Sequence, residues 1–299
     1  MMKILLTGKN GQVGFELQRA LAPLGELVAV DQDECDLADA AAIRELIRRV
    51  KPGLIVNPAA YTAVDKAESD VATADAVNAR APGVIGAEAA RLGAWVVHFS
   101  TDYVFDGTKP EAYVEEDATN PQGVYGRSKR DGELALQASG ARHVILRTSW
   151  VVGAHGNNFA KTMLRLAAER EQLSVVADQY GVPTSAALLA DLTALLVREA
   201  QLKGQADFAF GLYHAVPAGV TTWHECACYV IEQALRAGRP LKARPETIKA
   251  ITAAEYPTPA RRPANSRLDT TRFRRTFGLE LPSWQSGLQH ILEQILNKP

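Results

Sequence analysis

The chain has 299 residues, 47% of them hydrophobic, and its 33 basic and 34 acidic side chains give a formal net charge of −1. A chain of this length can bury a large core in one domain or two unequal ones. The balanced charge disfavours nucleic acid and anionic membranes as partners. The first apolar stretch is too short for a secretory signal, and no later run approaches the ~20 residues of a membrane span. We therefore expect a globular protein of the cytoplasm.

Three cysteines, Cys35, Cys226 and Cys228, cannot form a disulfide framework, which is typical of a reducing compartment. Cys226 and Cys228 lie close to His224, but a zinc site needs a second pair of ligands at wider spacing. We expect buried thiols here and no metal site.

Strand and helix patterns alternate through the first 150 residues. The predicted strands are Lys3 to Thr7, Glu26 to Asp31, Leu54 to Asn57, Trp95 to Ser100 and His143 to Arg147. The predicted helices are the run from Val13 to Leu21, Ala38 to Val50, Asp70 to Arg91, and Tyr125 to Ala138, the last with Lys129, Arg130 and Glu133 facing outward. This order predicts an α/β fold with a doubly wound parallel sheet, the Rossmann fold, in a dinucleotide-binding domain over residues 1–150.

The pattern loosens after Trp150, and prolines become frequent. Helices are predicted over Phe159 to Glu169, Ser185 to Ala200, Trp223 to Ala237 and Trp284 to Leu296. We expect a smaller C-terminal α/β substrate-binding region over 151–184 and 216–299. A segment near 185–215 is expected to return to the Rossmann domain.

The first strand is followed by a glycine-rich loop that opens the first helix. Gly8, Gly11 and Gly14 follow a Gly-x-x-Gly-x-x-Gly spacing, with Gln12 and Val13 between the second and third. Free N–H groups and the helix dipole attract a pyrophosphate at such a position. The loop therefore predicts dinucleotide binding, whereas a plain glycine turn is the alternative.

The end of the second strand bears on the choice of cofactor. Asp31 has the spacing of a carboxylate that accepts hydrogen bonds from an adenosine ribose, which favours NADH. Lys9, in the glycine loop, could reach a 2′-phosphate, so NADPH stays open as well. Asp36 and Leu37 could border the adenine, or Asp36 could cap the helix that begins at Ala38.

A hydroxyl, a phenol and an amine occur along the chain in the order that carbonyl reduction requires. Thr101 lies just past a strand, at the carboxyl edge of the sheet where open α/β proteins bind ligands. Tyr125 and Lys129 are four residues apart on a helix, so that the ammonium can favour the phenolate. We expect Tyr125 to donate a proton while Thr101 holds the substrate oxygen and Lys129 contacts the nicotinamide ribose.

These residues resemble the extended short-chain dehydrogenase/reductases, and among them the dTDP-4-dehydrorhamnose reductase family. The resemblance covers essentially the whole chain. It is carried by the glycine loop and by the runs 57–68, 100–105, 125–129, 156–159, 178–184 and 262–266.

The resemblance implies reduction of the C4 keto group of dTDP-4-dehydro-L-rhamnose to dTDP-L-rhamnose, a sugar donor for bacterial O-antigen and lipopolysaccharide. It implies that Tyr125 is the proton donor, that Lys129 assists it, that Thr101 and Asp102 touch the sugar nucleotide, and that Trp150 lines its pocket. It also implies a set of dinucleotide contacts: Gly11, Gln12, Val13, Asp31, Ala60, Tyr61 and Thr62. For Trp150 the residues alone favour simple burial.

Some family members are described as dimers that contain magnesium. This sequence keeps the acidic residues Glu16 and Glu293, but Ala187 stands where a third carboxylate aligns. The missing oxygen ligand argues against a shared metal. A homodimer is an expectation from the resemblance, and hydride transfer here needs no metal.

Two other readings stay open. A sugar-nucleotide epimerase or dehydratase shares the Tyr-Lys pair, although a dehydratase needs an Asp-Glu pair after the threonine and only Asp102 is present. A regulatory subunit would bind dinucleotide without catalysis. Arg262 and the loop around Asn265 could engage a diphosphate, fix the wall of the pocket or form a solvated basic loop. Gln179 and Pro183 could shape the sugar pocket or merely turn the chain.

Overall fold

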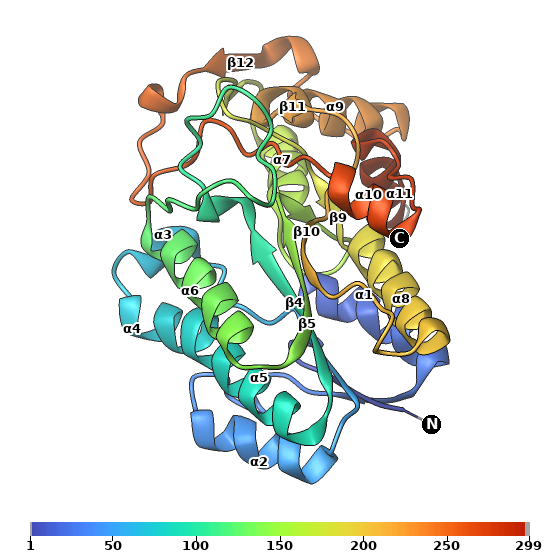
Figure 1. Ribbon diagram of the computed structural model, residues 1–299. Helices are drawn as coiled ribbons and strands as arrows, with labels where there is room; N and C mark the ends of the chain where they lie inside the picture. Colours follow the sequence, from blue (N-terminus) through green and yellow to red (C-terminus); the bar gives the residue numbers. More distant parts are fainter. Residues whose placement is uncertain (1, 297–299) are drawn as a thin grey trace.

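Residues 2–296 are described by the structure, a computed structural model. Its centre is a parallel sheet of six strands in the order β10-β5-β4-β3-β1-β2 (Figure 1). The strands are β1 Lys3–Leu6, β2 Glu26–Ala29, β3 Leu54–Asn57, β4 Trp95–Thr101, β5 Arg142–Thr148 and β10 Gly211–His214. Every residue of β3 and β4 is buried, as expected for strands covered on both faces. The predicted Rossmann fold is confirmed.

Helices cover both faces of this sheet and form two separate cores. On one face α1 (Gln12–Leu21) and α8 (Ala186–Lys203) pack against alternate strand residues such as Ile4 and Val97. On the other face α2 (Ala40–Val50), α5 (Ala81–Leu92) and α6 (Val124–Ala138) lie together (Figure 1). The alternation of side chains along each strand sends neighbouring residues into different cores. The helix α8 and the strand β10 both come from the segment 185–215.

A third core lies beyond the carboxyl edge of the sheet, among the remaining elements. Its helices are α7 Phe159–Glu169, α9 Trp223–Arg236 and α11 Trp284–Leu296. Three strand pairs complete it: β6 (Val151–Val152) with β9 (Thr184–Ser185), β7 (Leu173–Val176) with β12 (Ile248–Ile251), and β8 (Tyr180–Gly181) with β11 (Thr221–Thr222). The shorter helices are α3 Val64–Ala67, α4 Val71–Ala74 and α10 Thr271–Phe277. Between residues 2 and 296, no helix has the length and apolarity to cross a membrane.

The predicted helix over Asp70 to Arg91 is divided in the structure. The α-helix α4 passes into a π-helical stretch, η2 (Asp75–Arg80), before α5 begins. Pro82 explains the change, since it lacks an N–H group and its ring would clash with the carbonyl of Asn78 in a regular α-helix.

Two further predictions were wrong. The side chain that caps α2 is Asp39, which accepts from the N–H of Ala41 at 2.7 Å, whereas Asp36 accepts from the N–H of Ala38 at 2.9 Å within the preceding turn. Of the side chains expected to face outward on α6, Lys129 and Glu133 are both buried. The helix packs this face against β4 and β5, and both charged groups find polar partners there.

Glu133 and Arg147 form a buried ion pair between α6 and β5. Two hydrogen bonds join the guanidinium to the carboxylate at 2.9 and 2.7 Å, and both side chains are about 5% exposed or less. Removing one partner of such a pair leaves an uncompensated buried charge.

We expect Glu133→Gln to lower the free energy of unfolding by about 3 kcal/mol, because Arg147 would keep its charge without a counterion. Glu169→Gln is the matched control, since Glu169 pairs with Arg165 on the surface at 3.1 Å, and it should cost less than about 0.5 kcal/mol. Urea denaturation of the three proteins measures both values. Equal stability of the two variants would contradict this role of the buried pair.

Candidate active site at the carboxyl edge of the sheet

A cleft of about 1220 Å³ opens at the carboxyl ends of the strands, between the Rossmann sheet and the C-terminal elements. It is lined by most of the residues that the sequence singles out: Gly8, Gly11, Gln12, Val13, Gly14, Asp31, Ala60, Thr62, Thr101, Asp102, Tyr125, Lys129 and Trp150. Asp36, Leu37 and Tyr61 lie outside this lining. Leu37 belongs to the core beneath α2, and the phenol of Tyr61 donates to Asp70 at 3.1 Å.

The glycine loop has the geometry of a phosphate-binding turn. Gly8 has a φ of +62°, and a Cβ at Gly14 would lie 1.9 Å from the carbonyl oxygen of Gly8. Helix α1 begins after Gly11, and no side chain caps its first N–H groups. These groups face the cleft, where they can bind an anion. The residues present therefore fit the pyrophosphate of a dinucleotide.

The C-terminal region holds this loop by hydrogen bonds. The Gln12 side-chain oxygen accepts from the N–H of Gly153 at 2.8 Å and from the Asn158 amide at 3.0 Å. The ring of His155 stacks on Phe15 with centroids 4.4 Å apart. Asn158 also caps α7. Dinucleotide and substrate regions are thus fixed relative to one another at the cleft.

Thr101 is the centre of a hydrogen-bond cluster. Its hydroxyl donates to Oδ1 of Asp102 at 3.0 Å and accepts from the N–H of Tyr103 at 3.2 Å. It also bonds to the phenol of Tyr125. This contact lowers the pKa of Tyr125, against the larger effect of burial.

Asp102 is a buried carboxyl group beside the reacting hydroxyls. Burial raises its pKa to about 6, although hydrogen bonds from Ser266 and Thr101 oppose the rise. Within residues 2–296 its Oδ2 atom has no hydrogen-bond partner. Burial raises the pKa of Tyr125 well above its ordinary value, and the charge of Asp102 adds to this shift. The phenol is therefore held in its protonated, donor form.

Lys129 is a buried amine at the carboxyl end of β4. Its ammonium donates to the carbonyl of Phe99 at 2.6 Å, on strand β4. Burial lowers the pKa of Lys129 to about 8, while the charge of Glu133 acts in the opposite direction. The spacing of four residues puts Tyr125 and Lys129 on one face of α6, but the long side chain reaches down to the sheet.

Aromatic side chains form part of the wall of the cleft. Trp150 has a φ of 46°, and its ring stacks on Trp223 with centroids 3.6 Å apart and planes 14° apart. A Cβ at Gly181 would lie 2.7 Å from the Trp150 ring, so that only glycine fits behind it. Both tryptophans line the cleft. Trp223 was not predicted from the sequence, because it starts α9 and has no motif around it.

Tyr103 and Arg262 form a second contact that was not predicted from the sequence. The Tyr103 ring meets that of Tyr125 edge to face, with centroids 5.5 Å apart. Arg262 donates to the Tyr103 hydroxyl at 3.1 Å and to Oδ2 of Asp65 at 2.7 Å. Arg262 therefore lies in a paired position on the cleft wall and not in a solvated loop. The run Thr101-Asp102-Tyr103 could have indicated the ring, since Tyr103 directly follows two predicted site residues.

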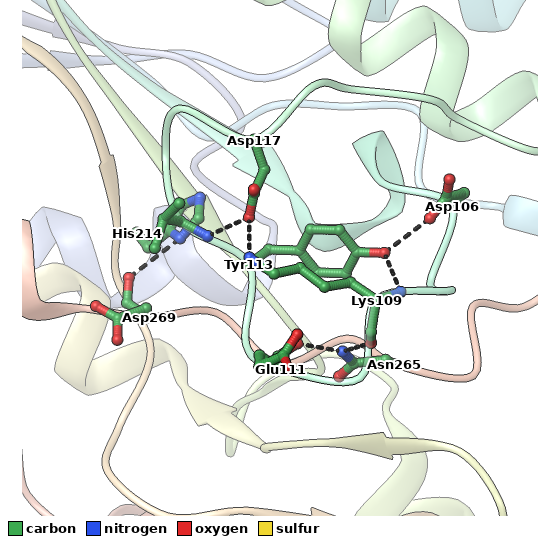
Figure 2. Close-up of polar contacts among 9 residues, drawn as sticks. Asp106, Lys109, Glu111, Tyr113, Asp117, His214, Asn265 and Asp269 are labelled. Atoms are coloured by element: carbon green, nitrogen blue, oxygen red, sulfur yellow. Dashed lines mark hydrogen bonds and ion pairs between the residues drawn. The ribbon is translucent and has the colours of Figure 1, made fainter.

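Asn265 anchors the loop that follows β4. Its amide donates to the carbonyls of Lys109 and Glu111, both at 2.6 Å, and Figure 2 shows these contacts next to the ring of Tyr113. The phenol of Tyr113 donates to Asp106 at 2.7 Å. The network joins the loop after β4 to the segment around Asn265.

The structure places the loop residues for which the sequence left two alternatives. Gln179 is buried and lines the main cleft, whereas Pro183 lies behind Trp150 and lines a separate small cavity of about 100 Å³.

Cys226 is buried, and Cys228 is partly buried with its sulfur 3.8 Å from Nε2 of His224. Across residues 2–296, no three His, Cys, Asp or Glu side chains are grouped so that they could hold a metal ion. Glu16 instead pairs with Arg19.

The fold and the cleft define a dinucleotide-binding oxidoreductase of the short-chain type, with a Tyr-Lys helix beside a strand-end threonine. The model of the RmlD substrate binding domain family matches residues 2–297, and the chain belongs to this family. This confirms the family resemblance found in the sequence.

Known proteins are similar to this chain over nearly its full length. The dTDP-4-dehydrorhamnose reductase of Escherichia coli is 52% identical over 298 residues, which cover 98% of each chain. The crystal structure of dTDP-4-dehydrorhamnose reductase from Bacillus anthracis in complex with NADP has a TM-score of 0.88 and 33% identity, and the match covers 97% of this chain and 98% of that one. A UDP-glucose 4-epimerase from Thermus thermophilus with NAD has a TM-score of 0.79, covering all of both chains at 18% identity, which shows the common fold alone.

We expect Gly14→Ala to abolish dinucleotide binding, because the new methyl group would overlap the Gly8 carbonyl and push α1 away from the loop. Gly93→Asn is the control: Gly93 ends a helix with positive φ, nothing lies within 4 Å of its Cβ position, and asparagine tolerates this conformation. Calorimetric titration with NADH and NADPH distinguishes the variants. Undiminished binding by Gly14→Ala would contradict the loop assignment.

Proposed function

We propose that this protein reduces the C4 keto group of dTDP-4-dehydro-L-rhamnose to give dTDP-L-rhamnose, with NADH or NADPH as hydride donor. The observation that carries the proposal is the hydrogen-bonded set of Thr101, Asp102 and Tyr125, in the same cleft as the uncapped N-terminus of α1. The full-length identity of 52% to a dTDP-4-dehydrorhamnose reductase supplies the substrate.

The side chains divide the reaction among them. When bound, the reduced nicotinamide supplies the hydride that carbon C4 of the sugar receives. Tyr125 gives its phenolic proton to the carbonyl oxygen as that oxygen gains charge. Thr101 fixes the direction of the phenol, and the Tyr103 ring restrains it from the side. Both restraints limit the positions from which the proton can be given.

Lys129 contributes to binding of the dinucleotide. With its ammonium on the carbonyl of Phe99 it lies at the floor of the cleft, where it can bind the nicotinamide ribose. The ring of Trp150 offers an apolar face to the sugar, and its stack on Trp223 fixes the ring plane. The family resemblance and their position in the lining of the cleft support contacts of Asp31, Ala60 and Thr62 with the dinucleotide.

The setting of the reaction is the synthesis of a sugar donor for bacterial surface polysaccharide, in the cytoplasm. A homodimer stays a prediction from the resemblance. No role is assigned to Mg²⁺, because the protons and the hydride are accounted for by the side chains and the dinucleotide.

We expect purified protein to consume NADPH or NADH, followed at 340 nm, only when dTDP-4-dehydro-L-rhamnose is added, in amounts equal to the dTDP-L-rhamnose formed. Tyr125→Phe should lower kcat by about 10³-fold and leave dinucleotide affinity within about twofold, because the ring stays and only the proton is lost. An equal loss of cofactor affinity would contradict the proton-donor role. Dinucleotide binding without turnover by the unmodified protein would favour a regulatory subunit.

We expect the rate of reduction to depend on Asp102. Below its pKa of about 6 this carboxyl is protonated. The protonated carboxyl group accepts the hydrogen bond from Thr101 less strongly. It also lacks the charge that raises the pKa of Tyr125, so the phenol becomes a better acid. In the unmodified protein kcat should rise about fivefold as pH falls from 7.5 to 5.5.

Asp102→Asn keeps the oxygen that accepts from Thr101 and removes the charge. Its kcat should already be high at pH 7.5 and stay flat down to 5.5. Stopped-flow measurement at saturating substrate separates kcat from KM. The idea fails if the variant keeps the same rise with falling pH.

A further inference from the structure

The end of β2 carries an ionic unit that the proposed reaction does not use. The ammonium of Lys9, in the glycine loop, forms an ion pair with Oε1 of Glu34, in the turn after β2. The other carboxylate oxygen, Oε2, accepts from the N–H of Asp31 at 2.8 Å. The hydrogen bond from Lys9 lowers the pKa of Glu34, which therefore carries its charge at neutral pH. Glu34 thus joins the two loops that border the adenosine end of the cleft.

Asp31 is fixed by the same unit. Its carboxylate oxygens accept from the N–H groups of Asn10 and Gln32, each at 2.8 Å. Each oxygen keeps a second lone pair. Asp31 can therefore accept hydrogen bonds from the 2′- and 3′-hydroxyls of an adenosine ribose while these contacts stay in place.

The charges around Asp31 disfavour binding of a 2′-phosphate. Asp31 and Glu34 contribute two negative charges and Lys9 one positive charge. The whole run 31–40 has five acidic and no basic side chains. Binding of a 2′-phosphate needs a cation that is not already paired. The ammonium of Lys9 is neutralised by Glu34.

We propose that Glu34 is a residue that determines cofactor specificity: by holding Lys9 it keeps the ammonium from the 2′-phosphate of NADPH and favours NADH. The inference rests on the proposed dinucleotide site and adds the ion pair that sets its preference for NADH over NADPH. Removing the Glu34 charge releases Lys9 and also removes a repulsion. The side chain of Glu34 is 46% exposed and that of Lys9 26%, so both can rearrange without unfolding.

Glu34→Gln is the direct test, because the amide keeps an oxygen for the Asp31 N–H group. Dissociation constants for NADPH and NADH are measured by calorimetry without sugar substrate. We expect the NADPH constant to fall about tenfold and the NADH constant to stay within about twofold. The gain should shrink at high salt, since both groups are partly exposed.

Three further proteins make the test specific. Lys9→Gln alone should leave NADPH affinity within about twofold, because Lys9 is already engaged, and the double variant should lose most of the gain of Glu34→Gln. Glu26→Gln removes an equal charge on β2, paired with Lys3 at 3.8 Å, and should change neither constant.

The outcomes separate this inference from the proposed function. An unchanged NADPH to NADH ratio in Glu34→Gln, with both nucleotides bound, overturns the role of Glu34 and leaves the reductase intact. A tenfold loss of NADPH affinity in Lys9→Gln alone also overturns it, because Lys9 would then already bind the phosphate. If the unmodified protein binds neither nucleotide, both proposals fail.

Discussion

The parallel register of the central sheet is the constraint on which the site depends. Because all six strands run in one direction, their carboxyl ends meet at one edge, and the chain must place its loops there. The glycine loop after β1, Asp31 after β2 and Thr101 at the end of β4 come together for this reason alone. The C-terminal elements then close the space above that edge, and Gln12 and Asn158 hold the two parts together.

The chemistry in turn depends on one hydroxyl. The Thr101 hydroxyl donates to Asp102, accepts from the N–H of Tyr103 and bonds to the phenol of Tyr125. Such a cluster has one arrangement of lowest energy, so that the phenol is directed before any substrate arrives. Pre-organisation of this kind supplies part of the barrier reduction in carbonyl reduction. The charge of Asp102 opposes phenolate formation, which keeps Tyr125 a proton donor at neutral pH.

Local pattern and chain order were enough to predict the sheet and the position of the glycine loop. Alternating strands and helices indicated the sheet, and Gly8, Gly11 and Gly14 stand in the cleft where the strand-loop-helix order placed them. The side chain of Lys129 was misplaced because spacing on a helix defines a face but not the depth to which a side chain reaches. The π-helical turn before Pro82 was missed because regular periodicity hides a single wide turn.

Contacts between distant segments could not be predicted from the sequence. Trp223 meets Trp150, and Arg262 meets Asp65 and Tyr103, across separations that only the folded chain closes. Likewise the pairing of Lys9 with Glu34 joins two loops 25 residues apart. The sequence identifies the charged residues, but it does not show which of them form ion pairs.

Transfer of deuterium is the most direct measurement of the central claim. The protein is given dTDP-4-dehydro-L-rhamnose with NADPH or NADH that carries deuterium at both C4 positions of the nicotinamide, and the product is analysed by NMR. The account predicts one deuterium at C4 of the rhamnosyl group of dTDP-L-rhamnose. Hydrogen instead of deuterium at this C4 position, or label at another carbon of the sugar, would contradict it.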